Sequence, residues 1–379
     1  MADGHTEATN ATRDQLCRDV LLMHFDWRVL ASQLGLLLVC SMSALADVRL
    51  LYELLTRTYY HVNLQRILAS QCVANLAFAT GKAAMPLVNT AITALLWLKE
   101  VDCWPLPVPL PVCLLLSSAI MPGGMAITYG MTGLGVERIV ATVRYRHYEH
   151  SRSTLLVGTL VTVQWLLSAL LLTASLLDET VVKADHFGQT SERALMCSAV
   201  QVRPMGDALN WVAGPSLLVE TIATVGVLVA MAVNFRRRRR HRCRTNDAVA
   251  AATLSHRYQT GENIKLSKLI VELVVAHFFC FVIGVSGAMA NREALPRWPT
   301  VEQLVRAELV HNVVGFFITG FGFVLAVVCV LNTAALRRRV LPRRLAKRMD
   351  ERASRKVLDE QRAADAWLAM ERAWRDRAH

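Results

Sequence analysis

Long apolar runs, separated by short polar segments, account for most of the chain. Each run is long enough to cross a hydrocarbon core of about 30 Å as a helix. Apolar and polar residues do not alternate strictly within the runs, which favours helices over barrel strands. The seven runs cover residues 29–48, 67–98, 109–139, 154–177, 211–233, 269–289 and 309–331. The pattern predicts an all-α membrane protein, built as a seven-transmembrane helix bundle.

Charge is sparse and unevenly placed. Hydrophobic residues make up 54% of the chain and charged residues 19%, below the roughly one quarter that is typical of proteins. The net charge of +12 would suit a nucleic-acid-binding protein, but Lys and Arg concentrate after the odd-numbered runs, above all in the C-terminal tail and in Arg236–Arg244. This positive-inside pattern predicts an external N-terminus and a cytoplasmic C-terminus. We therefore expect anionic inner-leaflet headgroups as partners, and no nucleic acid.

The chain divides into three predicted regions. Residues 1–28 form an extracellular N-terminus, in which a sequon marks Asn10 as a glycosylation site. Residues 29–331 form the transmembrane domain. Residues 332–379 form a basic, helical cytoplasmic tail that begins with a juxtamembrane amphipathic helix. Between the fifth and sixth runs we expect a flexible loop over residues 245–262, with the sixth helix beginning near Ile264.

The reactive side chains do not form a catalytic pattern. The sequence has nine cysteines, and four of them fall outside the membrane or at its outer face, where disulfides persist. These four are Cys17, Cys103, Cys113 and Cys197, and they allow three pairings. The sequence shows no spacing typical of a metal site, a nucleophilic catalyst or a phosphate-binding loop. It thus predicts a protein that is not an enzyme and carries no cofactor or metal.

Several ionisable residues lie inside the predicted spans, where they are costly and often functional. The main ones are Lys82, Glu220, Glu272 and His277. They could line an ion or proton path, so a multispanning transporter is the alternative function. A transporter is expected to show an internal repeat or short broken helices in matching halves, and the sequence shows neither.

Glu137 and Arg138 stand at the inner end of the third run, followed by a basic, tyrosine-bearing loop. Seven helices with an external N-terminus resemble G-protein-coupled receptors, which carry an acidic-Arg-aromatic motif at this place. Cys113 lies 25 residues before Arg138, as in the rhodopsin-like class, and Cys197 matches the partner in the second external loop. The resemblance implies a Cys113–Cys197 disulfide.

Other motifs differ from the rhodopsin-like class. Ile139 stands in place of the usual tyrosine, and Thr80 in place of the aspartate of the sodium site. His277-Phe278-Phe279-Cys280 stands where Cys-Trp-x-Pro is usual.

The nematode serpentine chemoreceptors of the Sra superfamily, especially the Sre-like families, are more similar. They carry a Glu-Arg-x-x-Ala-Thr…Tyr-Glu signature and a Phe-His-x-Asn-Leu motif before the second helix. The corresponding residues here are Glu137-Arg138-Ile139-Val140-Ala141-Thr142, Tyr148-Glu149 and Tyr60-His61-Val62-Asn63-Leu64.

The resemblance implies a chemosensory, olfactory type of receptor in the plasma membrane, with a sensory cilium as one location. An external small molecule would shift the bundle so that its cytoplasmic side engages a heterotrimeric G protein. The implied coupling residues are Glu137, Arg138, Thr142, Tyr145, Tyr148 and Glu272. Adjacent residues of a helix face each other poorly, so Arg138 at rest has three candidate partners: Glu137, Glu272 or a backbone carbonyl.

The ligand is expected to bind in the outer half of the bundle. One face of the third helix repeats every three to four residues and carries Met121, Gly124, Met125 and Thr128. Three polar residues of the last two runs would complete this site: His277, His311 and Asn312. Such a site suits a small, mostly apolar or weakly polar ligand. The alternative is that these residues only pack the bundle.

Overall fold

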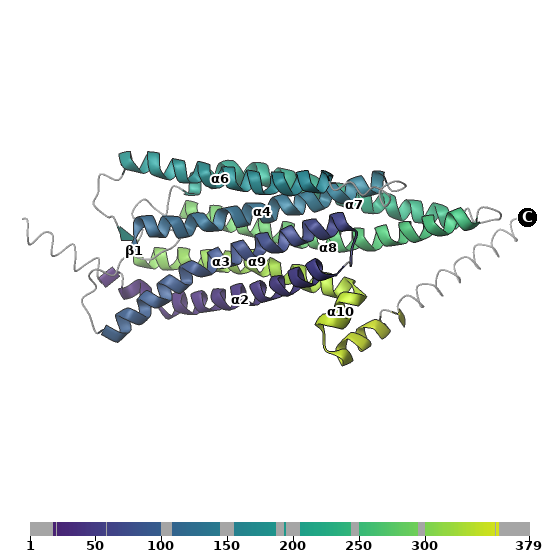
Figure 1. Ribbon diagram of the computed structural model, residues 1–379. Helices are drawn as coiled ribbons and strands as arrows, with labels where there is room; N and C mark the ends of the chain where they lie inside the picture. The colour runs from purple at the N-terminus through teal and green to yellow at the C-terminus, as the bar shows by residue number, and fades with distance from the viewer. Residues whose placement is uncertain are drawn as a thin grey trace, which may run out of the picture. The chain divides into compact units, whose positions relative to one another are not determined.

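The computed structural model is helical over most of its length. It describes residues 18–19, 21–57, 59–99, 108–144, 155–186, 193–194, 205–243, 250–294, 300–352 and 354–355. The helices are α2 (Trp27–Thr56), α3 (Val62–Lys99), α4 (Leu110–Val143), α6 (Leu155–His186), α7 (Met205–Cys243), α8 (Ala250–Ala294), α9 (Val301–Asn332) and α10 (Ala334–Val340) (Figure 1). The predicted seven-helix bundle is confirmed, since each apolar run corresponds to one long helix from α2 to α9.

Two very short strands interrupt the helices. β1 (Val108–Pro109) pairs antiparallel with β2 (Arg193–Ala194). They join the start of α4 to the segment between α6 and α7.

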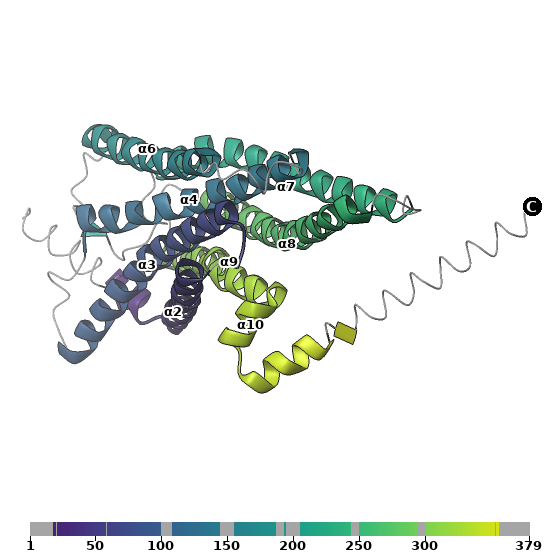
Figure 2. The ribbon, with the colours of Figure 1, turned by 45° about the vertical axis from the view of Figure 1, so that its right-hand side comes forward.

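The prediction of a loop over residues 245–262 is wrong for most of this segment, because α8 begins at Ala250. Hydropathy marks only the membrane-crossing part of a helix, whereas packing of α8 against α7 lets both helices continue beyond it. Figures 1 and 2 show α7 and α8 running side by side past the end of α4. The fifth and sixth helices therefore form a long hairpin at the predicted inner end.

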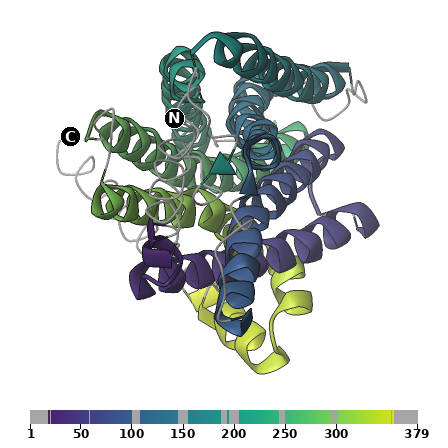
Figure 3. The ribbon, with the colours of Figure 1, turned by 90° about the vertical axis from the view of Figure 1, so that its left-hand side faces the viewer.

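Helix α4 packs against α3, α6, α7 and α8, and Figure 3 shows the bundle along its helices. Small residues allow these close approaches. A Cβ at Gly123 would lie 2.6 Å from the backbone nitrogen of Phe78 on α3, and one at Gly135 would lie 3.1 Å from Val227 on α7. The residues of α4 are consequently among the most buried in the molecule.

The outward-facing surface of the bundle is apolar. Leu38, Leu45, Leu166 and Ile222 are more than half exposed, as expected for side chains that face lipid. By length and composition, α2, α9 and the segments Gly214–Arg237 and Ile264–Ala290 can each cross a membrane. The molecule is a multi-pass membrane protein.

Residues from Val327 onward form a separate compact unit. Within it, Arg337 and Arg338 donate to Asp350 at 2.7 and 2.6 Å. These hydrogen bonds, with that from Arg338 the larger influence, hold the pKa of Asp350 below its usual value. Leu336 and Ala346 are buried in the same unit, so α10 and the helical segment after it hold each other in place.

Candidate functional site

The inner end of α4 carries a buried ion pair within a single helix. The Arg138 guanidinium donates from Nε and from a terminal nitrogen to the two carboxylate oxygens of Glu137. Arg138 is 1% exposed and Glu137 is 0% exposed. Two parallel hydrogen bonds between guanidinium and carboxylate give a strong and geometrically defined contact.

The candidate Glu272 has a partner on its own helix. It is half-exposed on α8 and pairs with Lys268, one turn earlier, at 3.6 Å. Arg138 donates to the carboxylate of the adjacent residue Glu137. The poor orientation expected of neighbouring residues is overcome because the long Arg138 side chain can fold back along the helix.

One turn beyond Arg138, a single amide joins three helices. The Asn234 side-chain nitrogen on α7 donates to Thr142 Oγ1 on α4 at 3.0 Å and to Ser267 Oγ on α8 at 3.4 Å. Arg237 on α7 also donates to the Thr142 carbonyl at 2.6 Å. Asn234, Thr142 and Ser267 are all buried. We call these three residues the inner latch.

A second charged cluster lies between α3 and α9. The Lys82 ammonium contacts His311 Nε2, and the Glu308 carboxylate on α9 attracts the same ammonium. The Lys82 stem crosses Gly315, where an added Cβ would lie 2.8 Å from Lys82 Cε. The buried lysine thus has counter-groups supplied by α9.

A third pair joins α7 to α8. His277 Nδ1 contacts Glu220 Oε1, and both side chains are buried. The imidazole packs edge-on against Phe321 of α9, with ring centroids 4.8 Å apart. Glu220 Oε2 is also buried and has no hydrogen-bond partner among the residues that the structure describes.

The polar residues predicted to form one ligand site each contact a different helix. His277 joins α7 to α8 and His311 joins α9 to α3, while Asn312 donates to Ser32 Oγ on α2 at 2.9 Å. Periodicity identifies residues on one face of a helix, but it does not show which neighbour that face meets.

The α4 members of the predicted ligand site pack tightly. Thr128 Oγ1 donates to the Gly124 carbonyl at 3.3 Å. A Cβ at Gly124 would lie 3.4 Å from the Phe78 ring. Thr128 and Met125 are buried.

A buried carboxylate in α2 was missed by the sequence reading. Asp47 Oδ1 accepts from Asn75 of α3 at 3.3 Å, and its Oδ2 accepts from Ser43 at 3.4 Å. Thr80, which stands in place of the sodium-site aspartate of the rhodopsin-like class, is exposed and donates to a carbonyl of its own helix. The signal available in the sequence was an aspartate at the end of an apolar run.

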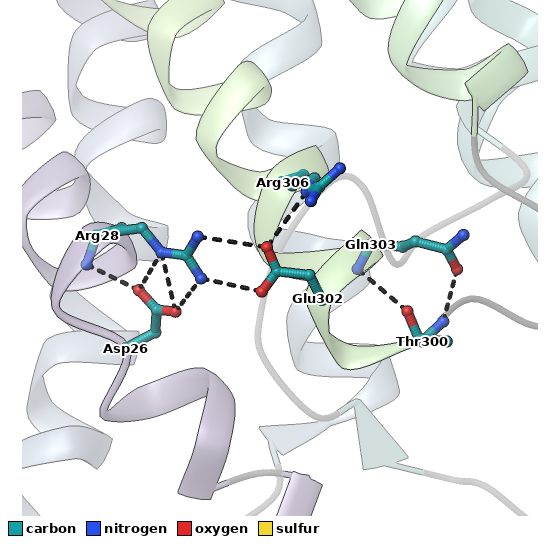
Figure 4. A network of polar contacts seen from close by, with 6 residues as sticks. All are labelled: Asp26, Arg28, Thr300, Glu302, Gln303 and Arg306. Carbon is teal, nitrogen blue, oxygen red and sulfur yellow. Dashed lines mark hydrogen bonds and ion pairs between the residues drawn. The ribbon is translucent and has the colours of Figure 1, made fainter.

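At the predicted outer end, ion pairs connect the starts of α2 and α9 (Figure 4). Asp26 caps α2 by accepting from the Arg28 backbone, and the Arg28 guanidinium reaches Glu302 at 3.0 Å. Glu302 also accepts from Arg306. Hydrogen bonds from Arg28 are the main reason that the pKa of Asp26 lies below its usual value.

The first turn of α9 carries a reciprocal cap. The Thr300 backbone donates to Gln303 Oε1 at 2.8 Å, and the Gln303 backbone donates to Thr300 Oγ1 at 3.4 Å (Figure 4). This capping box satisfies two N–H groups at the helix start. In the described parts of the chain, no group of three or more His, Cys, Asp or Glu side chains could hold a metal ion.

Comparison with known proteins identifies the family. Residues 17–351 match the model of the serpentine type 7TM GPCR receptor class ab chemoreceptors. The chain belongs to this family. The receptor is also similar to serpentine receptor class alpha/beta-14 of Caenorhabditis elegans, with 25% identity over 343 residues that cover 88% of this chain and 79% of the relative. The prediction of a nematode serpentine chemoreceptor is confirmed; the matching class is ab, whereas the sequence motifs had pointed especially to the Sre-like families.

The remaining predicted positions of the receptor are only partly described. Tyr145, Tyr148, Cys197 and the sequon residue Asn10 lie outside the described residues. Cys113 and Met121 lie within α4, but their side chains are outside the part of the chain that the structure describes. Their proposed roles stay predictions.

Proposed function

We propose that the receptor detects an external small molecule within its bundle and activates a heterotrimeric G protein from the predicted inner end. Family membership supports the receptor class. The observation that carries the proposal is the inner latch, in which Asn234 ties α4 to α7 and α8. The latch lies one turn beyond Arg138, at the end where the basic links are expected in the cytoplasm.

Release of the latch would be the conformational step. If α8 moves away from α4, the bonds from Asn234 to Thr142 and Ser267 cannot both persist. A ligand can drive this movement only by binding the moved arrangement more tightly than the latched one. Opening would expose Arg138, which stays charged at any physiological pH, to backbone carbonyls or carboxylates of the G-protein α subunit.

Neighbouring groups complete the proposed coupling surface. Tyr145 and Tyr148 follow α4 in the chain, and Glu272 is half-exposed on α8. Basic residues of the same end would bind anionic inner-leaflet lipids in the plasma membrane. A Cys113–Cys197 disulfide and a glycan on Asn10 are the corresponding proposals for the outer side.

The test is basal and ligand-evoked nucleotide exchange on a purified G protein by the receptor in lipid nanodiscs. Asn234→Ala removes both latch bonds, and we expect it to raise the basal rate. Arg138→Ala is expected to lower exchange while surface expression persists. Thr221→Ala is the control on α7, because Thr221 is exposed and donates to the Leu217 carbonyl one turn earlier in the same helix.

Two results would contradict the proposal. One is unchanged exchange in both Asn234→Ala and Arg138→Ala at normal expression. The other is ion or proton flux in liposomes that requires Lys82 and Glu220, since this would favour a transporter. The two buried clusters, on α3 with α9 and on α7 with α8, motivate the flux measurement.

A further inference from the structure

Helix α7 carries a polar stripe within its apolar membrane segment. Ser216, Glu220 and Thr224 recur every four residues, so they lie on one face of the helix. Ser216 and Glu220 are buried. Polar groups in a transmembrane segment are costly and usually face a partner or a ligand.

Two oxygen atoms of this stripe lack partners. Glu220 Oε1 contacts His277, but the buried Glu220 Oε2 and the buried Thr224 Oγ1 have no hydrogen bond within the described part of the chain. A buried carboxylate normally has its oxygens satisfied, because an unpaired polar atom loses its hydration without compensation. The two atoms therefore mark acceptor capacity that the described residues do not fill.

Aromatic rings surround the histidine partner of Glu220. Phe321 of α9 meets the His277 ring edge-on, and Phe281 of α8 stacks near it with centroids 6.1 Å apart. Aromatic faces attract cations, most strongly where water is excluded. The Glu220 carboxylate, whose partner His277 contacts these rings, favours a positively charged ligand.

We propose that the ligand class recognised by this receptor is a small primary amine in its protonated form, bound to Glu220 between α7 and α8. This inference rests on the proposed function and names the ligand of that receptor. The ammonium would donate to Glu220 Oε2 and Thr224 Oγ1. The hydrocarbon part of the ligand would lie against the phenylalanine rings.

The histidine makes the exchange of partners possible. An ammonium that donates to Glu220 would compensate the carboxylate charge, so the contact with His277 would no longer be needed to hold it. An arginine in place of His277 would have to stay charged. Loss of the Glu220–His277 contact would remove one polar link between α7 and α8 and so make it easier for α8 to move away from α4, the movement that opens the inner latch.

The charge pattern argues against an anionic ligand at this position. Glu220 would repel it, and the buried cation Lys82 already has His311 and Glu308 beside it. A divalent metal ion is also disfavoured, because it needs several oxygen ligands and the described residues supply no such group.

The experiment measures binding apart from signalling. Full-length receptor in nanodiscs is titrated with two amines, isobutylamine and benzylamine. Isobutanol and benzyl alcohol serve as uncharged counterparts of similar shape. The shift in unfolding temperature is recorded for each compound. We expect shifts from the amines only. Glu220→Gln should weaken amine binding about tenfold to a hundredfold, the loss of one charge-assisted hydrogen bond.

Two further variants keep the result interpretable. Thr224→Val is a milder change that should weaken the amine a few-fold if Glu220→Gln does not fold. Glu53→Gln is the matched control, since Glu53 is buried in α2 and held by Arg49 and Tyr59; it should leave the amine-dependent shift intact.

The outcomes separate the two proposals. Amine shifts that depend on Glu220, without nucleotide exchange, would support the amine site and overturn G-protein coupling. Exchange evoked by the alcohols equally in wild type and Glu220→Gln would support coupling and overturn the amine site. Absence of any Glu220-dependent amine shift also overturns it.

Discussion

The Glu137–Arg138 pair of α4 and the Glu220–His277 pair of α7 and α8 are both buried, but they differ in two respects. The first lies within one helix and contains a group that cannot lose its charge. The second connects two helices and contains a histidine in place of an arginine. The Lys82 cluster resembles the second, because it also joins two helices through a histidine.

This difference separates stable from switchable contacts. An intrahelical pair travels with its helix and does not resist motion between helices. A pair between helices must break or move when they separate, and a histidine lowers the penalty of breaking it. We infer that the centre of the bundle holds the elements that change, whereas Glu137 and Arg138 form a fixed group that the change exposes.

The largest expected effect comes from breaking the fixed pair. Glu137→Gln removes the carboxylate that accepts two hydrogen bonds from the buried, charged Arg138, and we expect a loss of about 3–5 kcal/mol in the free energy of unfolding. Thermal unfolding in nanodiscs measures it. Glu272→Gln is the control, because its half-exposed pair with Lys268 should be worth less than about 1 kcal/mol. Equal losses in the two variants would show that burial of the pair does not matter.

A double-mutant cycle sharpens the comparison at the Lys82 cluster. Lys82→Met removes the ammonium that the Glu308 carboxylate attracts. Adding Glu308→Gln removes the leftover charge. The double variant should therefore lose about 0.5–3 kcal/mol less free energy of unfolding than the sum of the losses in the two single variants. Additive losses would mean that Glu308 does not act as the counter-charge of Lys82.

The smallest effect is expected at the outer ion pairs. The pKa of Asp26 is lowered by Arg28, so the carboxylate stabilises the folded state above about pH 4 and this contribution is lost as the pH falls through its folded-state pKa. Asp26→Asn keeps a capping side chain but removes the charge. It should cost less than about 1 kcal/mol at pH 7, and the difference from wild type should shrink below pH 4 and in high salt. A difference independent of pH would argue against the ion pair.

The sequence predicted the helices better than their contacts. Runs of apolar residues identify membrane spans because the bilayer imposes a length on them, and Glu137 and Arg138 were found because they end such a run. Hydropathy could not show that α8 begins at Ala250, since that part of the helix is polar and depends on packing against α7.

The candidate site shows the same limit. His277, His311 and Asn312 were predicted as one group, but each has a partner from a different helix: Glu220, Lys82 and Ser32. Helix order along the chain does not give the rotation of each helix about its axis. Asn234 and Ser267 were missed because single polar residues at the ends of apolar runs have no spacing that marks them.

The length of the α7–α8 hairpin would amplify a change of tilt. Ala250 stands 27 residues before His277 on α8, a length of about 40 Å at the rise of a helix. A tilt of roughly 10° about His277 would therefore carry the start of α8 about 7 Å sideways. A small change of tilt at the level of His277 would thus move the start of α8 by a distance of the order of a side-chain length.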